Sequence, residues 1–185
     1  MSFVLKDDFH SSMVESVYND LSSRRSNYFY FIGRVVGWNN EGVPETPNPS
    51  YAYEREVRNK IIATKKIQPA DVSYVVRRIN WTLGFVYDNY DDYSTSFTSY
   101  SGASSLKTSN FYVLTDSFNV YKCLFNNNDS QSTVKPSGTD PIPITTADGY
   151  VWKYLYTIPL SSRNRFLTTD WMPVTKSVLN SFYSN

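Results

Sequence analysis

The segment that decides the fold is DGYVWKYLYTI, residues 148–158. After the turn residues Asp148 and Gly149, an aromatic or branched side chain recurs at every second position from Tyr150 to Ile158. Side chains two residues apart in an extended chain point to the same face, so this alternation predicts a strand with one apolar face. We expect these five side chains to lie together on one side of a sheet.

Further strands are predicted upstream of this segment. Residues 111–115 and 120–125 are rich in β-branched and aromatic side chains, and the four residues between them, DSFN, suit a hairpin turn. The stretch from 72 to 81, continued at 84–87, has similar character. Residues 28–32, YFYFI, are apolar or aromatic at every position, which is typical of a strand that is covered on both faces.

Two longer helices and a short third one are also predicted. Between residues 8 and 22 apolar side chains recur every three or four positions and therefore share one helix face, and Asp7 or Asp8 can cap the first turn. Residues 51–66 show a second apolar stripe beside acidic and basic side chains spaced four apart. The third helix is expected at 161–167.

The order of these elements predicts the fold class. Strands joined by turns and polar loops predominate, so we expect a mainly β, α+β fold with an antiparallel β-sandwich-like core and two or three peripheral helices. We see no internal repeat and no convincing linker, which favours a single domain over residues 1–185. Its β-rich core would span 28–158, followed by a short C-terminal segment at 159–185.

Charge and cysteine content exclude several classes of protein. The chain carries 18 basic and 17 acidic side chains, whereas nucleic-acid coats and polybasic membrane anchors need a clear basic excess. No apolar run approaches the ~20 residues that cross a bilayer, and residues 1–10 contain no apolar signal segment. Cys123 is the single cysteine, which excludes an internal disulfide and indicates folding in a cytosol. We expect neither nucleic acid nor a membrane as partner.

No arrangement of residues predicts catalysis. His10, the single histidine, lies in the first helix pattern without a nucleophile motif elsewhere, so a surface or helix-end position is expected. Cys123 lies within a strand pattern, where a buried and unreactive thiol is expected. The aspartates at 88, 91 and 92 lack the spacing of a calcium loop and the asymmetry of glycosidase carboxylates, which favours a solvated turn. We expect no enzyme activity, no metal and no cofactor.

The aromatic content favours protein contacts instead. Tyr, Phe and Trp make up 17% of the chain against 19% charged residues, a balance that suits either extensive interfaces or an aromatic β core. Polar loops at 38–51, 87–100 and 126–147 are candidate interfaces. The candidate contact residues are Trp38, Arg77, Arg78, Tyr87, Tyr90, Tyr93 and Tyr100. Two alternatives stay open: Trp38 could be core, and the two arginines could pair with acids of their own domain.

Several motifs, in order along the chain, resemble the baseplate wedge proteins of contractile-tailed phages. RRINW at 77–81, followed by YDNYD at 87–91, is similar to the Arg-x-x-Trp … Tyr-Asp-x-Tyr stretch of that family. FYVLT at 111–115 and VYKCL at 120–124 look like its paired strands. Most specific is DGYVWKYLYTIP at 148–159, which resembles the Asp-Gly-Tyr-Val-Trp-x-Tyr-Leu segment of the gene-eight wedge proteins of T-even-like myoviruses.

That resemblance implies a structural virion protein of the tail baseplate. It would be made and assembled in the host cytoplasm, contact other wedge subunits and self-associate as a dimer, without enzyme activity. T-even members of the family are considerably longer than this chain. The alternative is a carbohydrate-binding or adhesin module of a phage tail, in which exposed Trp and Tyr rings would stack on sugars. A cell-wall hydrolase is disfavoured because no acid–base pair is evident.

Overall fold

The structure is a computed structural model that describes residues 7–23, 27–33, 37–44, 46, 48–92 and 99–174. By its internal contacts the chain divides into two compact units, residues 1–72 and 73–185, and each is described by itself. The predicted α+β class is confirmed, with antiparallel sheets and three α-helices in the described part. That all of this forms a single folding domain stays a prediction. No helix in the described ranges is long and apolar enough to cross a membrane.

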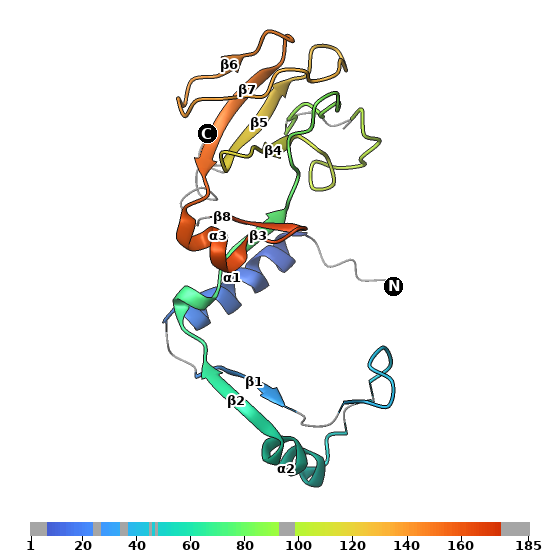
Figure 1. Cartoon of the computed structure of the whole chain (residues 1–185), viewed down its shortest axis with the longest axis vertical. Helices are drawn as coiled ribbons and strands as arrows, with labels where there is room; N and C mark the ends of the chain where they lie inside the picture. Colours follow the sequence, from blue (N-terminus) through green and yellow to red (C-terminus); the bar gives the residue numbers. More distant parts are fainter. Residues whose placement is uncertain are drawn as a thin grey trace. The chain divides into compact units, whose positions relative to one another are not determined.

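Unit 1 is an antiparallel two-stranded ribbon accompanied by helices. Strand β1 pairs with β2 from Phe29 opposite Lys66 to Ile32 opposite Ala63, and the two lie side by side in Figure 1. The predicted helix at 8–22 is confirmed, since α1 covers it. The elements of unit 1 are α1 (Asp7–Ser23), β1 (Phe29–Gly33), α2 (Tyr51–Asn59), β2 (Ile61–Lys66) and a 3₁₀ turn, η1 (Pro69–Asp71).

The second predicted helix is only half correct. Helix α2 begins where expected, with the Ser50 hydroxyl accepting from the Tyr53 N–H at 3.3 Å, but it ends at Asn59. Residues 61–66, expected to be helical, form β2 instead. The apolar residues Ile61 and Ile62 fit a helical stripe, yet they are β-branched and find a strand partner in β1. Pairing across 30 residues of sequence thus overrides the local pattern.

The prediction that 28–32 is covered on both faces is wrong for the described chain. Every residue of β1 is exposed, with Phe29 at 57% and Ile32 at 62% of full exposure. Among the described residues of unit 1, none is buried. The sequence pattern of a central strand therefore occurs in a strand that, within the described part of unit 1, pairs on one edge only and is exposed at every residue.

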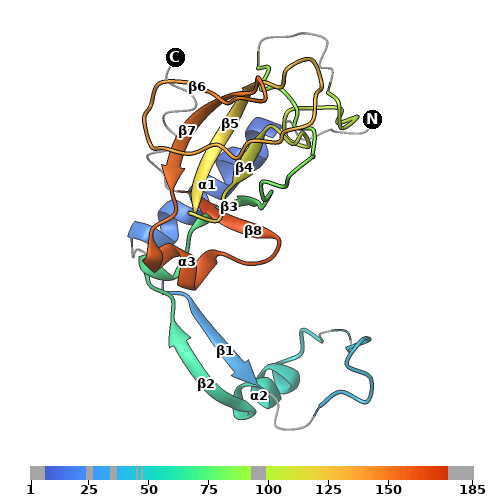
Figure 2. The same ribbon diagram turned by 45° about the horizontal axis from the view of Figure 1, so that its top comes forward.

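Unit 2 is built on a four-stranded antiparallel sheet in the order β4-β5-β7-β6, visible in the upper part of Figure 2, and a separate β3–β8 pair. The strands predicted at 111–115, 120–125 and 150–158 and the helix at 161–167 are confirmed. The stretch 84–87 forms no strand. The elements of unit 2 are β3 (Tyr74–Arg77), β4 (Tyr112–Leu114), β5 (Asn119–Phe125), β6 (Ile144–Thr145), β7 (Val151–Thr157), α3 (Leu160–Phe166) and β8 (Trp171–Val174).

Two hydrophobic clusters form the core of unit 2. The second cluster includes Met172 from β8 and packs against Val76 from β3, so the two antiparallel sheets are joined through it. The first cluster covers the other face of the four-stranded sheet with residues from the coil around Tyr87. The buried members of the first cluster are Tyr87, Val113, Tyr121, Cys123, Tyr150 and Trp152, and those of the second are Leu114, Val120, Ile158 and Met172.

The single apolar face expected for residues 150–158 is corrected by a β-bulge. Tyr121 lies opposite Tyr154 and Val120 opposite Tyr156, so Leu155 is an extra residue without a partner on β5. Before the bulge, the aromatic side chains of β7 belong to the first cluster; after it, Tyr156 and Ile158 belong to the second. One inserted residue therefore lets a single strand supply both cores.

Candidate protein interface

The apolar ribbon, residues 28–33 with the partner strand β2, carries a run of five consecutive exposed apolar or aromatic side chains at 28–32. The Ile67 N–H donates to the Tyr28 carbonyl at 2.8 Å, which fixes the antiparallel pairing. Alternation then directs the backbone groups of Phe29 and Phe31 to the other edge of β1, with which no described strand pairs. An edge of this kind can accept a further strand.

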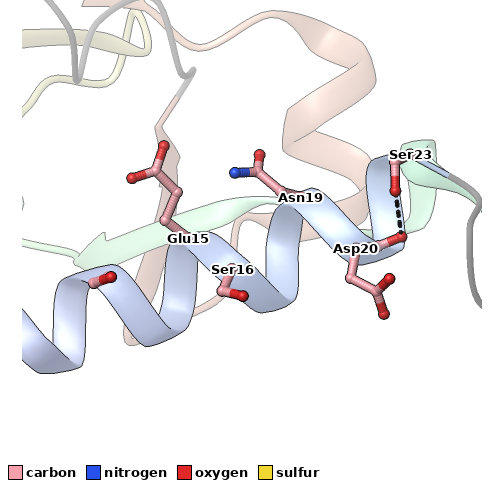
Figure 3. Close-up of a pocket in the computed structure, with 6 residues that line it drawn as sticks. Glu15, Ser16, Asn19, Asp20 and Ser23 are labelled. Carbon is pink, nitrogen blue, oxygen red and sulfur yellow. Dashed lines mark hydrogen bonds between the residues drawn. The ribbon is translucent and has the colours of Figure 1, made fainter.

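Helix α1 adds a second apolar surface to unit 1. Its side chains Met13, Val14 and Val17 are each more than half exposed. The polar side of the same helix carries a shallow hollow, shown in Figure 3, in which Ser23 Oγ donates to the Asp20 carbonyl at 3.1 Å. The hollow is lined only by α1, through Ser12, Glu15, Ser16, Asn19, Asp20 and Ser23. A hollow on one helix encloses nothing, so it offers no catalytic pocket.

Tyr87, predicted as an interface residue, is instead a core residue. It is 1% exposed, and its ring meets Trp152 edge-on with centroids 5.5 Å apart. Its hydroxyl accepts from the Thr82 N–H at 2.6 Å and lies 3.3 Å from the Asn80 carbonyl, to which it donates. Burial raises the pKa of the phenol. The prediction was wrong because residues 85–88 pack onto the sheet although they form no strand.

Arg77 and Arg78 hold loops of their own unit. Arg77 Nη2 donates to Asn110 Oδ1 at 2.7 Å and to the Thr108 carbonyl at 3.1 Å. Arg78 Nη1 donates to the Thr168 carbonyl at 2.7 Å. The partners are neutral oxygens within the domain, where the alternative weighed from the sequence expected acids. A role for these arginines in contacts with other chains stays a prediction.

The remaining candidates differ in their exposure. Trp38 is half-buried in unit 1, and its backbone N–H donates to Glu41 Oε1 at 2.6 Å. In unit 2, Tyr100 is 59% exposed, whereas Tyr90 is half-buried. Tyr93 lies outside the described residues. Within unit 2, the predicted contact residues thus range from the buried Tyr87 to the exposed Tyr100.

Asp88, weighed from the sequence as a member of an acidic group, holds a loop in place. Its carboxylate accepts from the Ser101 hydroxyl at 2.6 Å and from the N–H groups of Ser101 and Asn110 at 2.9 and 2.7 Å. Burial alone would raise the pKa of Asp88, but these hydrogen bonds outweigh it and lower the pKa. Within the described chain, no group of three or more His, Cys, Asp or Glu side chains is placed to hold a metal ion.

Asp148 has a similar role at the start of β7, and sequence reasoning missed it. Its Oδ2 accepts from the backbone N–H groups of Thr133 and Val134 at 2.7 and 2.8 Å. Burial works against ionisation here too, and hydrogen bonds from Thr146 and the backbone lower the pKa of Asp148 nonetheless. The Asp-Gly turn signal predicted the local bend, but the loop that this carboxylate binds is distant in sequence.

Gly149 and Tyr150 complete the structural role of the motif. Gly149 has φ +83°, and a Cβ atom there would lie 2.8 Å from the Asn127 side chain, so both backbone and space require glycine. The Tyr150 hydroxyl donates to the Ser130 carbonyl and accepts from the Tyr87 N–H. Residues 148–150 thus hold the loop before β7 against the start of that strand.

Cys123 is buried, as the sequence predicts. Burial raises the pKa of its thiol to about 12. A thiol that stays protonated and inaccessible at neutral pH is a poor nucleophile.

No family model matches the chain, and no curated protein is significantly similar to it. The likeness to baseplate wedge proteins therefore stands on the motifs quoted above.

Proposed function

We propose that this chain is a structural subunit of the baseplate of a contractile phage tail, a wedge component that joins neighbouring subunits and catalyses no reaction. The observation that carries the proposal is the apolar ribbon of unit 1. The motif resemblance suggests which assembly the chain belongs to. The exposed apolar surface suggests that the chain binds a partner at all.

The energetics of a two-stranded ribbon favour its burial against a partner. Isolated two-stranded ribbons are marginally stable in water, because they bury too little apolar area to offset the ordering of the chain. Residues 28–32 are five consecutive exposed apolar or aromatic side chains. Since a fully buried aromatic side chain covers ~150–250 Å², these half-exposed side chains together leave several hundred Å² uncovered, as large as the largest patch on a typical monomer.

Unit 2 supplies the rigid body that an assembly subunit also needs. Its loop from 126 to 147 is fixed at several points, since Asn126 donates to the Tyr87 carbonyl at 2.9 Å and Asp148 holds Thr133 and Val134. A loop that is already ordered loses little entropy when a partner binds. Unit 2 can therefore present fixed contacts while unit 1 contributes the apolar surface to be covered.

Particle incorporation tests the proposal. Phe31→Ser with Ile32→Ser removes two exposed apolar side chains of the ribbon, and Ile142→Ser, at an exposed loop position of unit 2, serves as the matched control. Purified tails from complemented phage are compared by quantitative mass spectrometry. We expect the ribbon variant to be depleted by at least about ten-fold while its circular dichroism stays that of the wild type, and the control to incorporate normally.

Normal incorporation of the ribbon variant would contradict the ribbon's role in assembly. If the wild-type chain itself were missing from purified tails, the baseplate assignment would fail. Light scattering of the isolated protein would in addition test the predicted dimer.

A further inference from the structure

Two lysines face each other across the central strands of the unit 2 sheet. Lys122 on β5 lies directly opposite Lys153 on β7, in strands that run side by side in Figure 2. Side chains in this relation have Cβ atoms ~4.5–5.5 Å apart, and like charges placed so are destabilising. Both residues are only partly exposed, so water screens their repulsion less than it would at an open surface.

The described part of unit 2 neutralises the positive charge of these two lysines only in part. Neither lysine is among the ion pairs of the described residues. Burial and the charge of Lys153 lower the pKa of Lys122, while Asp92 acts in the opposite direction. Among the described residues, Asp92 therefore offsets part of the charge of Lys122, and no ion pair holds Lys153.

The Tyr90 ring positions the Lys122 side chain. The Lys122 ammonium nitrogen lies 3.6 Å from the centroid of the Tyr90 ring, a cation–π contact. The ring is backed by Phe111, 5.1 Å away between centroids, and its hydroxyl donates to Asp92 Oδ2 at 2.9 Å. The ring thus holds the Lys122 ammonium group in place, on a residue that lies opposite Lys153 in the sheet.

We propose that Lys122 and Lys153 bind a carboxylate side chain of a neighbouring protein subunit, with Tyr90 positioning Lys122. The inference rests on the proposed assembly function and names the chemistry of one partner contact. A protein carboxylate fits because two lysines lie opposite each other here and neither belongs to an ion pair of the described residues. A nucleic-acid backbone would need a row of basic contacts, which two lysines do not provide.

The proposal predicts opposite effects on stability and on assembly. Lys153→Gln removes the repulsion, so the isolated protein should melt at a higher temperature than the wild type. The same change should lower incorporation into tails by at least about ten-fold, and Lys153→Arg, which keeps the charge, should restore most of it. Lys135→Gln is the matched control, because Lys135 is a surface lysine already paired with Asp116 at 2.9 Å.

A lysine that served only the fold would not show this pattern. Normal incorporation of Lys153→Gln would overturn the inference, even in a phage whose tails reject the ribbon variant. Absence of the wild-type chain from tails would instead overturn the assembly function on which the inference rests. The two failures are therefore distinguishable.

A second measurement identifies the ligand on the isolated full chain. A glutamate-rich peptide is titrated against protein with isotope-labelled lysine side chains, at constant ionic strength. We expect the Lys122 and Lys153 signals to shift with the peptide, and not with inorganic phosphate or with a serine-rich peptide of equal length. Equal shifts with phosphate would assign a free-anion site and overturn the carboxylate assignment, as would the absence of any shift with the peptide.

Discussion

Asp148 and Gly149 act on the backbone in different ways at the start of β7. The carboxylate draws Thr133 and Val134 toward the strand, and the glycine supplies a backbone conformation that other residues adopt only with strain. The turn itself could be predicted, since Asp-Gly is a turn signal. The partner loop could not, because nothing in a local pattern states which distant N–H groups a carboxylate will bind.

Two glycines give a matched test of this local geometry. Gly84 has φ +79° and open space where a Cβ would lie, whereas Gly149 has the same kind of φ and the Asn127 side chain in the way. Gly84→Ala should cost about 1–2 kcal/mol of unfolding free energy from the backbone alone. Gly149→Ala should cost at least about 1 kcal/mol more from crowding. Urea unfolding measures both, and equal losses would contradict the crowding at Asn127.

The hydrogen-bonded carboxylates of Asp88 and Asp148 predict a loss of stability in acid. Hydrogen bonds lower the folded-state pKa of Asp88 and of Asp148, so each adds stability above the unfolded pKa of about 3.9 and loses it as the pH falls through the folded value. Stability should therefore fall below about pH 4. Asp148→Asn should be less stable at pH 7 and show a shallower acid decline. Urea midpoints from pH 2 to 7 measure this, and an unchanged slope in the variant would contradict it.

At the scale of elements, β7 shows which features of a strand an alternating sequence pattern predicts and which it does not. The strand and its apolar face up to Tyr154 follow from the sequence, and the structure confirms them. The bulge at Leu155 does not, because an inserted residue leaves the sequence alternation intact and changes only the pairing with β5. The register of a strand pair depends on both strands, whereas the alternation of apolar residues is a property of one strand alone.

The ribbon and the four-stranded sheet should differ in local stability. Strands β5 and β7 lie between buried clusters, whereas β1 and β2 contain no buried residue. In the isolated protein, hydrogen exchange at the amides of β1 and β2 should be at least about 100-fold faster than at those of β5 and β7, since local opening there costs much less free energy. Mass spectrometry of exchanged peptides measures this. Equal protection would show that the ribbon is already covered in the free protein.

At the scale of the whole molecule, the burial is concentrated in one unit. All of the buried side chains in the described chain belong to residues 73–174, and unit 1 has none. Composition predicted an aromatic core or an aromatic interface without choosing between them. The structure buries Tyr87 and Trp152 in the core and leaves the rings of β1 exposed.

This division predicts that unit 2 folds alone. A fragment of residues 73–174 keeps both clusters and both of its sheets, so it should unfold cooperatively with a midpoint close to that of the full chain. A fragment of residues 1–72 should show little cooperative unfolding, because it has no buried core in the described part. Thermal denaturation followed by circular dichroism tests both fragments. A cooperative unit 1 or an unfolded unit 2 would contradict the division.

The central claim is that other subunits cover the apolar ribbon in a tail baseplate. A reconstruction of the intact phage particle tests it most directly, because it shows where the chain lies and what surrounds residues 28–33. We predict that the chain lies in the baseplate and that a different chain buries the side chains of β1. A tail without this chain, or a baseplate in which β1 faces solvent on both sides, would contradict the account.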